Sequence, residues 1–478
     1  MRSSVFRSFC SCSLPPTAPA SPPRIQKRPP PSDRPSERSS VTVFLPPPEF
    51  LESPRGRQFG APPPRYRTDA LPSTSSVVIV GGGLAAIGLA GTLWHAGIRD
   101  FVIVDRSSRL GGQFFDRADT LGQRVLRSPY DHHPGAEGYR DCELLDFARL
   151  RWSLLTEGER LQVRMAQAGH RSVVPMDVFE AYCDHVVALH GLAYRAWQGD
   201  VRQIDPNDDE VLVRTSLGDI RAENVVLCTG EESVTAPADW WPGDTPPEGV
   251  GYWSEPVGVA DGPTVVVGAG LSAAHVVSKA LAAGGQVHWV IREVAERYQC
   301  ADVNASFFRA EGRSRFHGTT WQNRLQMMGQ HRRASVMFEF RPALTAAEER
   351  GSLVVHRGTG VTAVHGRTDG GPAAVDLSDG TSASGHQVVL ALGTRPLIGA
   401  ELLPADVVCA RDGWPDLDEV SLAYRAAPRV YALGAAACMV LGPAARNIDG
   451  HRVGTSRIVT SILWQLETST RRTEVTHV

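Results

Sequence analysis

One part of the chain has the apolar pattern of a strand, a helix and a second strand. The β-branched run Val77–Val80 leads into three glycines, and helix-compatible small and apolar residues follow over 84–96. A second apolar run, Phe101–Val104, ends at Asp105. Residues 77–98 carry no Asp, Glu, Lys or Arg and are long enough to span a membrane, but the glycines interrupt a continuous helix. The pattern therefore predicts a buried β-α-β unit.

A later segment repeats this plan. Thr264–Val267 leads into Gly268-Ala269-Gly270, and the next residues predict a helix over 271–283. A strand predicted over 286–291 then ends at Arg292. Two such units in one chain indicate two nucleotide-binding folds.

Beyond these units the pattern is less regular. It predicts a helix over 177–192, a β-meander over 199–221, strands over 352–375 and 388–390, and a helix over 452–466. Strands that alternate with helices are typical of parallel sheets covered on both faces. The expected fold class is therefore α/β.

The N-terminal region has a different composition. Half of the 34 prolines lie in residues 1–72, among serines and arginines, and we expect a disordered or polyproline-like extension over 1–74 that is dispensable. Its basic residues superficially resemble an organellar transit peptide, but proline opposes the amphipathic helix that such a peptide needs. An unstructured extension or an over-long gene model is the favoured interpretation.

The charge and cysteine content narrow the function. A net charge of -3 provides no basic surface for nucleic acid, and we expect neither nucleic-acid nor membrane partners. Eight cysteines without a CxxC pair favour a reducing compartment, which we take as the cytoplasm. The spacing of His, Cys and carboxylates indicates no metal site, since His185 and His190 do not share a helix face.

The first glycine-rich turn has the spacing Gly81-x-Gly83-x-x-Ala86, with Asp105 24 residues after Gly81. Gly81 permits a tight turn, Gly83 lets a pyrophosphate approach the helix N-terminus, and Ala86 allows close helix–strand packing. Asp105 would accept hydrogen bonds from a ribose. Because the turn follows a strand, opens a helix and has its acid at the right distance, it predicts dinucleotide binding.

The second turn, Gly268-x-Gly270-x-x-Ala273, has Arg292 where the first has its acid. A cation at this strand end can pair with a 2′-phosphate, which a carboxylate would repel. The sequence therefore favours NADPH over NADH, although Arg292 could also be a solvated surface residue.

These features resemble the two-dinucleotide-domain flavoproteins, a group that includes disulfide reductases, class B flavin monooxygenases and N-hydroxylating monooxygenases. The resemblance covers roughly residues 75–468 and includes the stretches Leu110–Gln113, Val226–Gly230, Val389–Gly393 and Val430–Gly434. It implies two Rossmann-like domains, the NAD(P)-binding domain being inserted into a discontinuous FAD-binding domain. The implied boundaries are 75–255 for the first part of the FAD domain, 256–384 for the NAD(P)H domain and 385–478 for the C-terminal part.

The motifs and the resemblance together imply FAD at the first turn and NADPH at the second. The residues expected to contact them are Gly81, Gly83, Ala86, Asp105, Arg106, Gly112, Gln113, Gly230, Gly268, Gly270, Ser272, Ala273, Arg292, Gly393 and Gly434. The group often has an acid after the last of these glycines, whereas this chain has Ala435, so ribityl contacts must come from elsewhere. A helix N-terminus around Gly442–Ala444 would favour an anionic reduced flavin ring.

Two branches of the group fit poorly. Disulfide reductases need a dithiol beside the flavin, but the near pair Cys10 and Cys12 lies in the extension and the other cysteines are scattered. Class B monooxygenases carry an FxGxxxHSxxW-like stretch between the two folds. The corresponding residues here place Trp253 at the histidine position and match at Ser254 alone.

The N-hydroxylating branch fits better. Leu126–Pro134, Val174–Tyr182 and Asp302–Phe308 resemble its substrate-side segments. Within them, Asn304 is the best candidate substrate contact, with a capping asparagine as the alternative. His132 and His133 are weak candidates for handling a proton, with hydrogen-bonded loop histidines as the alternative.

The leading hypothesis is an FAD-dependent, NADPH-consuming monooxygenase that hydroxylates a small molecule with molecular oxygen through a flavin hydroperoxide. One alternative is a flavin reductase or dehydrogenase that passes electrons to a quinone, a carrier protein or an organic acceptor. A non-catalytic FAD-binding regulatory protein is another. The sequence names no substrate and no oligomeric state.

Overall fold

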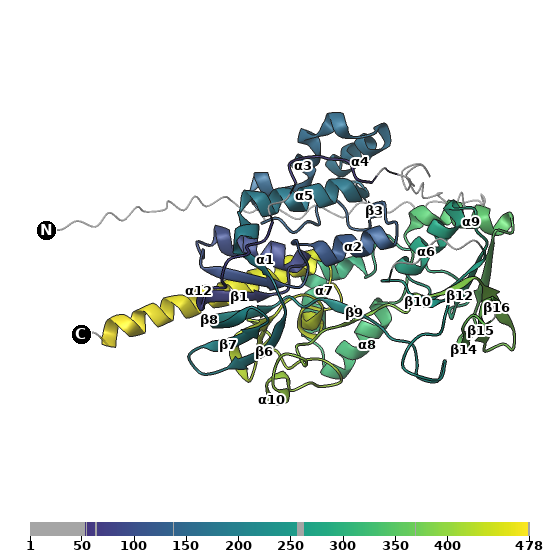
Figure 1. Ribbon diagram of the computed structural model, residues 1–478. Helices are drawn as coiled ribbons and strands as arrows, with labels where there is room; N and C mark the ends of the chain where they lie inside the picture. The colour runs from purple at the N-terminus through teal and green to yellow at the C-terminus, as the bar shows by residue number, and fades with distance from the viewer. Residues whose placement is uncertain are drawn as a thin grey trace, which may run out of the picture. The chain divides into compact units, whose positions relative to one another are not determined.

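The computed structural model describes residues 53, 55–62, 65–136, 138–255, 262–368 and 370–476 (Figure 1). Most of the extension expected over 1–74 therefore lies outside the described residues. Among the described helices, none combines the length and the apolar character that a membrane crossing requires.

The first sheet is built around the first predicted β-α-β unit. Its strands follow the order β19-β20-β8-β1-β2-β5, and β6 and β7 extend it through β8. The strands β20, β8, β1, β2 and β5 pair in parallel, whereas β6, β7 and β8 form the predicted meander. Their bounds are β1 Thr74–Val80, β2 Phe101–Asp105, β5 Ala196–Gln198, β6 Val201–Pro206, β7 Val211–Thr215, β8 Gly218–Leu227, β19 Ala423–Tyr424 and β20 Ala427–Ala432.

The helices beside this sheet pack against one another. Helix α1 contacts both α5 and the long α12, which Figure 1 draws in yellow. Near α5, the short strands β3 and β4 pair antiparallel. The bounds are α1 Leu84–His95, α2 Gly112–Thr120, β3 Val125–Leu126, α3 Leu144–Leu150, α4 Glu157–Gln167, β4 Val174–Pro175, α5 Met176–Leu189, α10 Ala405–Val408, α11 Cys438–Leu441 and α12 Ile448–Thr476.

The second sheet is fully parallel, with the order β10-β17-β11-β12-β13. Alternate residues of β11 face opposite sides: Val266 packs toward the helices, and Val265 and Val267 pack toward the antiparallel meander β14-β15-β16. Burial on both faces explains the continuous apolar runs in the sequence. The bounds are β10 Val250–Tyr252, β11 Thr264–Val267, α6 Leu271–Ala282, β12 Val287–Ile291, α7 Ala310–His317, α8 Trp321–His331, α9 Arg341–Glu349, β13 Leu353–Arg357, β14 Val361–His365, β15 Ala373–Leu377, β16 Ser382–Gly385 and β17 Gln387–Leu390.

Two short strands connect the sheets. Strand β9 (Glu231–Ser233) follows β8, and β18 (Thr394–Pro396) follows β17, and they pair antiparallel. Because β10 and β17 both belong to the second sheet, the sheet boundaries lie at these crossovers rather than at the expected 255/256 and 384/385. The apolar pattern predicted β17 as the strand over 388–390 but did not predict β10, and it did not show which sheet β17 joins, because pairing partners are a long-range property.

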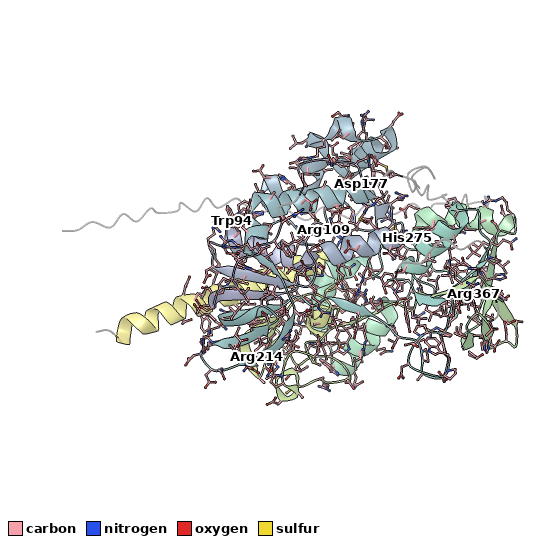
Figure 2. The ribbon with its side chains drawn as sticks, in the orientation of Figure 1. Trp94, Arg109, Asp177, Arg214, His275 and Arg367 are labelled. Atoms are coloured by element: carbon pink, nitrogen blue, oxygen red, sulfur yellow. The ribbon has the colours of Figure 1, made fainter. Side chains whose placement is uncertain are left out.

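The end of the expected extension differs from our expectation. Arg57 binds the Glu159 carboxylate through both terminal nitrogens, at 2.9 and 2.7 Å, and its backbone N–H donates to Asp177. Phe59 and Tyr66 are buried. Residues 55–62 and 65–72, which we call the strap, therefore pack on the folded unit, where Arg55 donates to Asp177 of α5, the residue labelled in Figure 2. The proline-rich composition of the region predicted disorder and gave no indication that Arg57, Phe59 and Tyr66 pack on the fold.

Candidate cofactor sites

The first glycine turn joins β1 to α1. Gly81 has φ +97°, which favours glycine, and a Cβ there would lie 2.5 Å from the carbonyl oxygen of Cys228. Gly83 has φ −69° and is the N-cap of α1, and a Cβ there would meet no atom within 4 Å. Ala86 is fully buried. The fold itself requires glycine at Gly81, whereas Gly83 leaves open space at the helix end.

The N-terminus of α1 suits an anion. No side chain caps its first turn, and that turn contains no acidic residue. Its backbone N–H groups and the positive end of the helix dipole are therefore available beside the space at Gly83. This arrangement fits a pyrophosphate.

Asp105 lies at the end of the neighbouring strand β2. Burial raises the pKa of Asp105, an effect that backbone N–H groups of Gly82, Ser107 and Arg106 partly offset. The hydroxyl of Tyr66, from the strap, also donates to Asp105 Oδ2, at 3.4 Å. The strap therefore lies next to the carboxylate that we expect to hold a ribose. The sequence did not predict this contact.

The Gly111-Gly112 element lies next to the first turn. The N–H of Gly111 donates to the carbonyl of Gly82 at 2.7 Å, and Gly111 has φ +74°. Gln113 is exposed on α2. The predicted contact Arg106 is also exposed, and its guanidinium lies 3.5 Å from Asp200. Gly111 therefore contacts the first turn through this hydrogen bond, whereas Gln113 and Arg106 are exposed.

The second glycine turn repeats the geometry of the first. Gly268 has φ +133°, and a Cβ there would lie 2.1 Å from the carbonyl oxygen of Ala391. Gly270 is the uncapped N-cap of α6, and the nearest atom to a Cβ there would be 4.0 Å away. Ala273 is fully buried, and Ser272 is half-buried in the first turn of α6. This helix end likewise leaves room for a phosphate group.

Arg292 follows the last residue of β12. Its side chain is exposed, and within the described part of the chain it has neither an ion pair nor a side-chain hydrogen bond. Glu293, which could have held the guanidinium, is exposed and uses its backbone carbonyl to accept from Gly358. The guanidinium is therefore available to an anionic ligand.

The remaining predicted glycines lie at the crossovers. Gly230, Gly393 and Gly434 have φ of +71°, +92° and +87°. Arg446 links the residues after the first two, because it binds the Glu231 carboxylate and donates to Thr394 Oγ1 at 2.6 Å. The sequence did not predict this clamp, which we define as Arg446 with Glu231 and Thr394, because the two residues that it binds are marked only by following the crossover glycines.

The three stretches that resemble N-hydroxylating enzymes lie together. Strands β3 and β4 bring the start of Leu126–Pro134 beside Val174–Pro175. Arg127 then reaches the Rossmann-type second domain, where it donates to Gln299 O at 3.1 Å and Ser335 Oγ at 3.0 Å. The ring of His132 lies 5.0 Å from that of Phe308.

The three weak catalytic candidates have different surroundings. His133 is buried between Glu143 and the Tyr182 hydroxyl, 2.9 Å from each, and burial lowers the pKa of His133 to about 4. Asn304 caps a short helical turn by accepting from Ser306 N at 2.9 Å, while its exposed amide nitrogen has no partner among the described residues. His132 is half-buried and is therefore more accessible to solvent than His133.

An ionic cluster around Asp302 was also missed. Arg332 lies 3.1 Å from the Asp302 carboxylate, and Asn447 donates to it at 2.8 Å. Burial opposes ionisation of Asp302, but Arg332, Arg127 and the Asn447 amide outweigh it and hold the pKa of Asp302 below its usual range. Nearby polar atoms are buried without a partner among the described residues: Asn447 Oδ1, Glu231 Oε1 and His451 Nδ1. Such orphaned atoms fit a site that receives a polar ligand.

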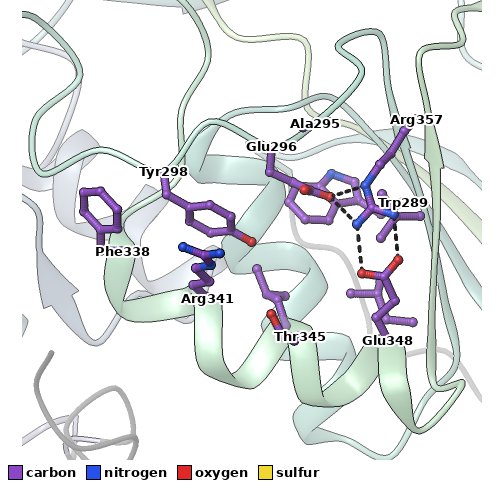
Figure 3. A pocket seen from close by; sticks show the side chains of 12 residues that line it. Trp289, Ala295, Glu296, Tyr298, Phe338, Arg341, Thr345, Glu348 and Arg357 are labelled. Atoms are coloured by element: carbon purple, nitrogen blue, oxygen red, sulfur yellow. Dashed lines mark hydrogen bonds and ion pairs between the residues drawn. The ribbon is translucent and has the colours of Figure 1, made fainter. Parts of the chain in front are cut away.

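A cavity of about 430 Å³ opens on the second domain beside β12 and β13 (Figure 3). Figure 3 shows Arg357 between two carboxylates on its wall: it lies 2.6 Å from Glu348 and 2.8 Å from Glu296. Trp289, which also lines the cavity, donates to the carbonyl of Gly268 at 2.6 Å. The cavity wall therefore contacts the second glycine turn through Trp289. The charges of Arg357, Glu296 and Glu348 on this wall are paired with one another.

The comparisons with known proteins agree with this architecture. The chain matches no protein-family model and no curated protein. Among solved structures it is similar to the ornithine N-hydroxylase of Kutzneria sp. 744, solved with reduced FAD, NADP+ and L-ornithine, with a TM-score of 0.66, 18% identity and coverage of 82% of this chain and 99% of that chain. The chain has the fold of the two-dinucleotide-domain flavin monooxygenases.

Other solved structures with this fold are less similar. A flavin-containing monooxygenase from Stenotrophomonas maltophilia has a TM-score of 0.54 at 16% identity, with coverage of 82% and 99%. The bacillithiol disulfide reductase of Bacillus cereus has the same TM-score at 15% identity, with coverage of 82% and 99%. The expected fold class and the resemblance to this group are confirmed.

Proposed function

We propose that this protein is an FAD-dependent monooxygenase that consumes NADPH and hydroxylates a small molecule. The observation that carries the proposal is the convergence of the three stretches that resemble N-hydroxylating enzymes, through the β3–β4 pair, Arg127 and His132. The fold likeness to an ornithine N-hydroxylase supports it. The described cysteines are free and come from separate elements, so a dithiol mechanism has no support among them.

The residues present fit both cofactors. The open N-terminus of α1 at Gly83 would hold the FAD pyrophosphate, and Asp105 would bind its ribose. Gly270 and the exposed Arg292 would hold the diphosphate and the 2′-phosphate of NADPH. When bound, the cofactor pair would supply hydride transfer and oxygen activation.

The chain's own residues would orient these cofactors and shield the reaction from water. The Arg446 clamp fixes the two crossovers relative to each other, and Arg127 holds the β3 loop to the second domain. Asn304 and His132 are the proposed substrate-side groups, because the Asn304 amide nitrogen is free within the described residues and His132 lies beside Phe308. His133 is a positioning residue, since both its ring nitrogens have partners.

The test uses the purified flavin-loaded chain. Anaerobic NADPH should bleach the flavin, and admission of air with a panel of small primary amines should transfer labelled oxygen from O₂ to a product nitrogen. Substrate should also lower the hydrogen peroxide formed per NADPH consumed. Rapid reoxidation with full peroxide yield for every amine would favour a reductase, and absence of flavin bleaching would overturn an NADPH-consuming function.

A further inference from the structure

Three potential metal ligands converge at the end of α1 that lies opposite its glycine turn. His95 is the last residue of α1, Cys142 ends a short helical turn, and His190 follows α5. The label of Trp94 in Figure 2 marks this end of the helix. No short spacing in the sequence links the three residues, so the pattern of His, Cys and carboxylates did not predict a metal site.

The ligand atoms form a compact triangle. His95 Nε2 and His190 Nε2 are 2.9 Å apart, and Cys142 Sγ lies 3.9 Å from each. Around a tetrahedral zinc ion with Zn–N of about 2.1 Å and Zn–S of about 2.3 Å, the corresponding separations are roughly 3.4 and 3.6 Å. The difference is about half an ångström or less, which small side-chain rotations remove.

We propose that His95, Cys142 and His190 bind one zinc ion, with solvent as the fourth ligand. Two imidazoles and a thiolate are a ligand set that zinc prefers. Binding replaces the thiol proton of Cys142, which passes to solvent, and transfers no electron. His95 is partly exposed, so that solvent can reach the fourth position.

The surrounding groups orient the ligands. His190 Nδ1 donates to the carbonyl of Val186 at 2.8 Å, which leaves Nε2 with its lone pair directed at the site. Cys142 lies between Asp141 and Glu143, whose carboxylates favour a cation at the sulfur. The guanidinium of Arg99 lies 3.9 Å over the Trp94 ring, and its positive charge opposes a cation at the site. The negative charges of the thiolate and the two carboxylates offset this repulsion.

The alternative arrangement is a hydrogen bond between two neutral histidines beside a free thiol. It accounts for the 2.9 Å contact between nitrogens. In that arrangement the almost fully buried sulfur has a backbone hydrogen bond with Ala136 and only long contacts, 3.9 Å, to the two nitrogens. A zinc ion engages all three atoms and joins the segment after β3 to α1 and α5. The ion would fasten the loop that carries His132 and His133 to these two helices.

The experiment measures zinc in the flavin-loaded, full-length chain after incubation with zinc and buffer exchange. We expect one zinc per chain in the wild type, and at least a tenfold loss of bound zinc in Cys142→Ser and His190→Gln. The matched controls are Cys183→Ser and His185→Gln, which lie on the neighbouring α5 and should keep the metal. Flavin content and thermal unfolding report whether each variant folds.

Cobalt substitution keeps the test decisive if the variants unfold. Wild-type chain loaded with Co²⁺ should show the visible bands of tetrahedral cobalt, at wavelengths longer than flavin absorption, together with a sulfur-to-metal charge-transfer band. Zinc should displace them. A wild-type chain that retains no zinc, a cobalt complex without a thiolate band, or Cys142→Ser and His190→Gln variants that bind as much zinc as the wild type would each overturn the proposal.

Discussion

The two glycines of the first turn have different structural roles. Gly81 combines φ +97° with a hypothetical Cβ contact of 2.5 Å to backbone, whereas Gly83 has an ordinary φ and open space around it. We expect Gly81→Ala to lose both thermal stability and flavin. Gly83→Val should lose flavin with the unfolding temperature of the apoprotein unchanged, because valine would occupy the pyrophosphate path without a clash in the protein.

Flavin absorbance per chain and thermal unfolding of the two apo-variants separate these outcomes. Retention of flavin by Gly83→Val would refute the proposed pyrophosphate path.

Arg292 carries the preference for a phosphorylated second nucleotide. Its guanidinium is exposed and has no partner within the described residues. If it pairs with the 2′-phosphate, Arg292→Ala should raise KM for NADPH roughly ten- to a hundredfold and leave NADH nearly unaffected. Arg350→Ala, an exposed arginine at the end of α9, is the matched control.

Steady-state kinetics with both nucleotides test this prediction. Equal weakening of NADPH and NADH by Arg292→Ala, or equal efficiency of the two nucleotides with the wild type, would show that Arg292 does not recognise a phosphate.

At the scale of elements, helix α6 contains a titratable group in an apolar environment. His275 is buried against the ring of Phe340, its Nε2 has no partner among the described residues, and burial lowers the pKa of His275 to about 3. Its folded-state pKa lies below the unfolded value of about 6.5, so the folded state binds fewer protons in that window. Stability contributed by neutral His275 is complete above pH 6.5 and declines as the pH falls toward 3.

His275→Leu should therefore reduce the acid sensitivity of the second domain. The free energy of unfolding of the variant minus that of the wild type should be about 2 to 3 kcal/mol more favourable to the variant at pH 4.5 than at pH 8. Denaturant unfolding at both pH values measures this gain. An identical difference at both values would mean that His275 is already accessible to protons.

At the scale of the whole molecule, the strap ties the region before the first domain to the fold. Deletion of residues 1–52 should leave flavin content and NADPH oxidation unchanged, whereas deletion of 1–72 should destabilise the protein. The longer deletion removes the cations that face Glu159 and Asp177, whose side chains are almost fully buried. This revises the expectation that the entire extension is dispensable.

A single substitution sharpens this test. Although burial disfavours the ionised form, Arg57 holds the pKa of Glu159 below its usual range. Arg57→Ala should cost about 3 kcal/mol of unfolding free energy, because it leaves a buried carboxylate unpaired. Arg214→Ala, which breaks an exposed ion pair on β7, should have little effect. Normal stability of the chain lacking 1–72 would show that the strap contacts contribute nothing.

The sequence by itself determined the two β-α-β units, their glycine turns and the fold class. These properties depend on local alternation, on φ preferences and on the spacing between Gly81 and Asp105, which are all short-range. Through their resemblance to N-hydroxylating enzymes, the sequence also indicated that the stretches around Arg127 and Asp302 lie on the substrate side. Their contact with each other still depended on pairing across the chain.

Tertiary structure alone decided which distant residues meet. The Arg446 clamp, the Asp302 cluster, the strap contacts of Arg57 and the triangle of His95, Cys142 and His190 each join residues from separate elements. None has a periodic or compositional signal, because a side-chain contact depends on how helices and sheets pack rather than on neighbours in sequence. Packing likewise decided that His133 is enclosed by Glu143 and Tyr182 while Arg292 remains open to solvent.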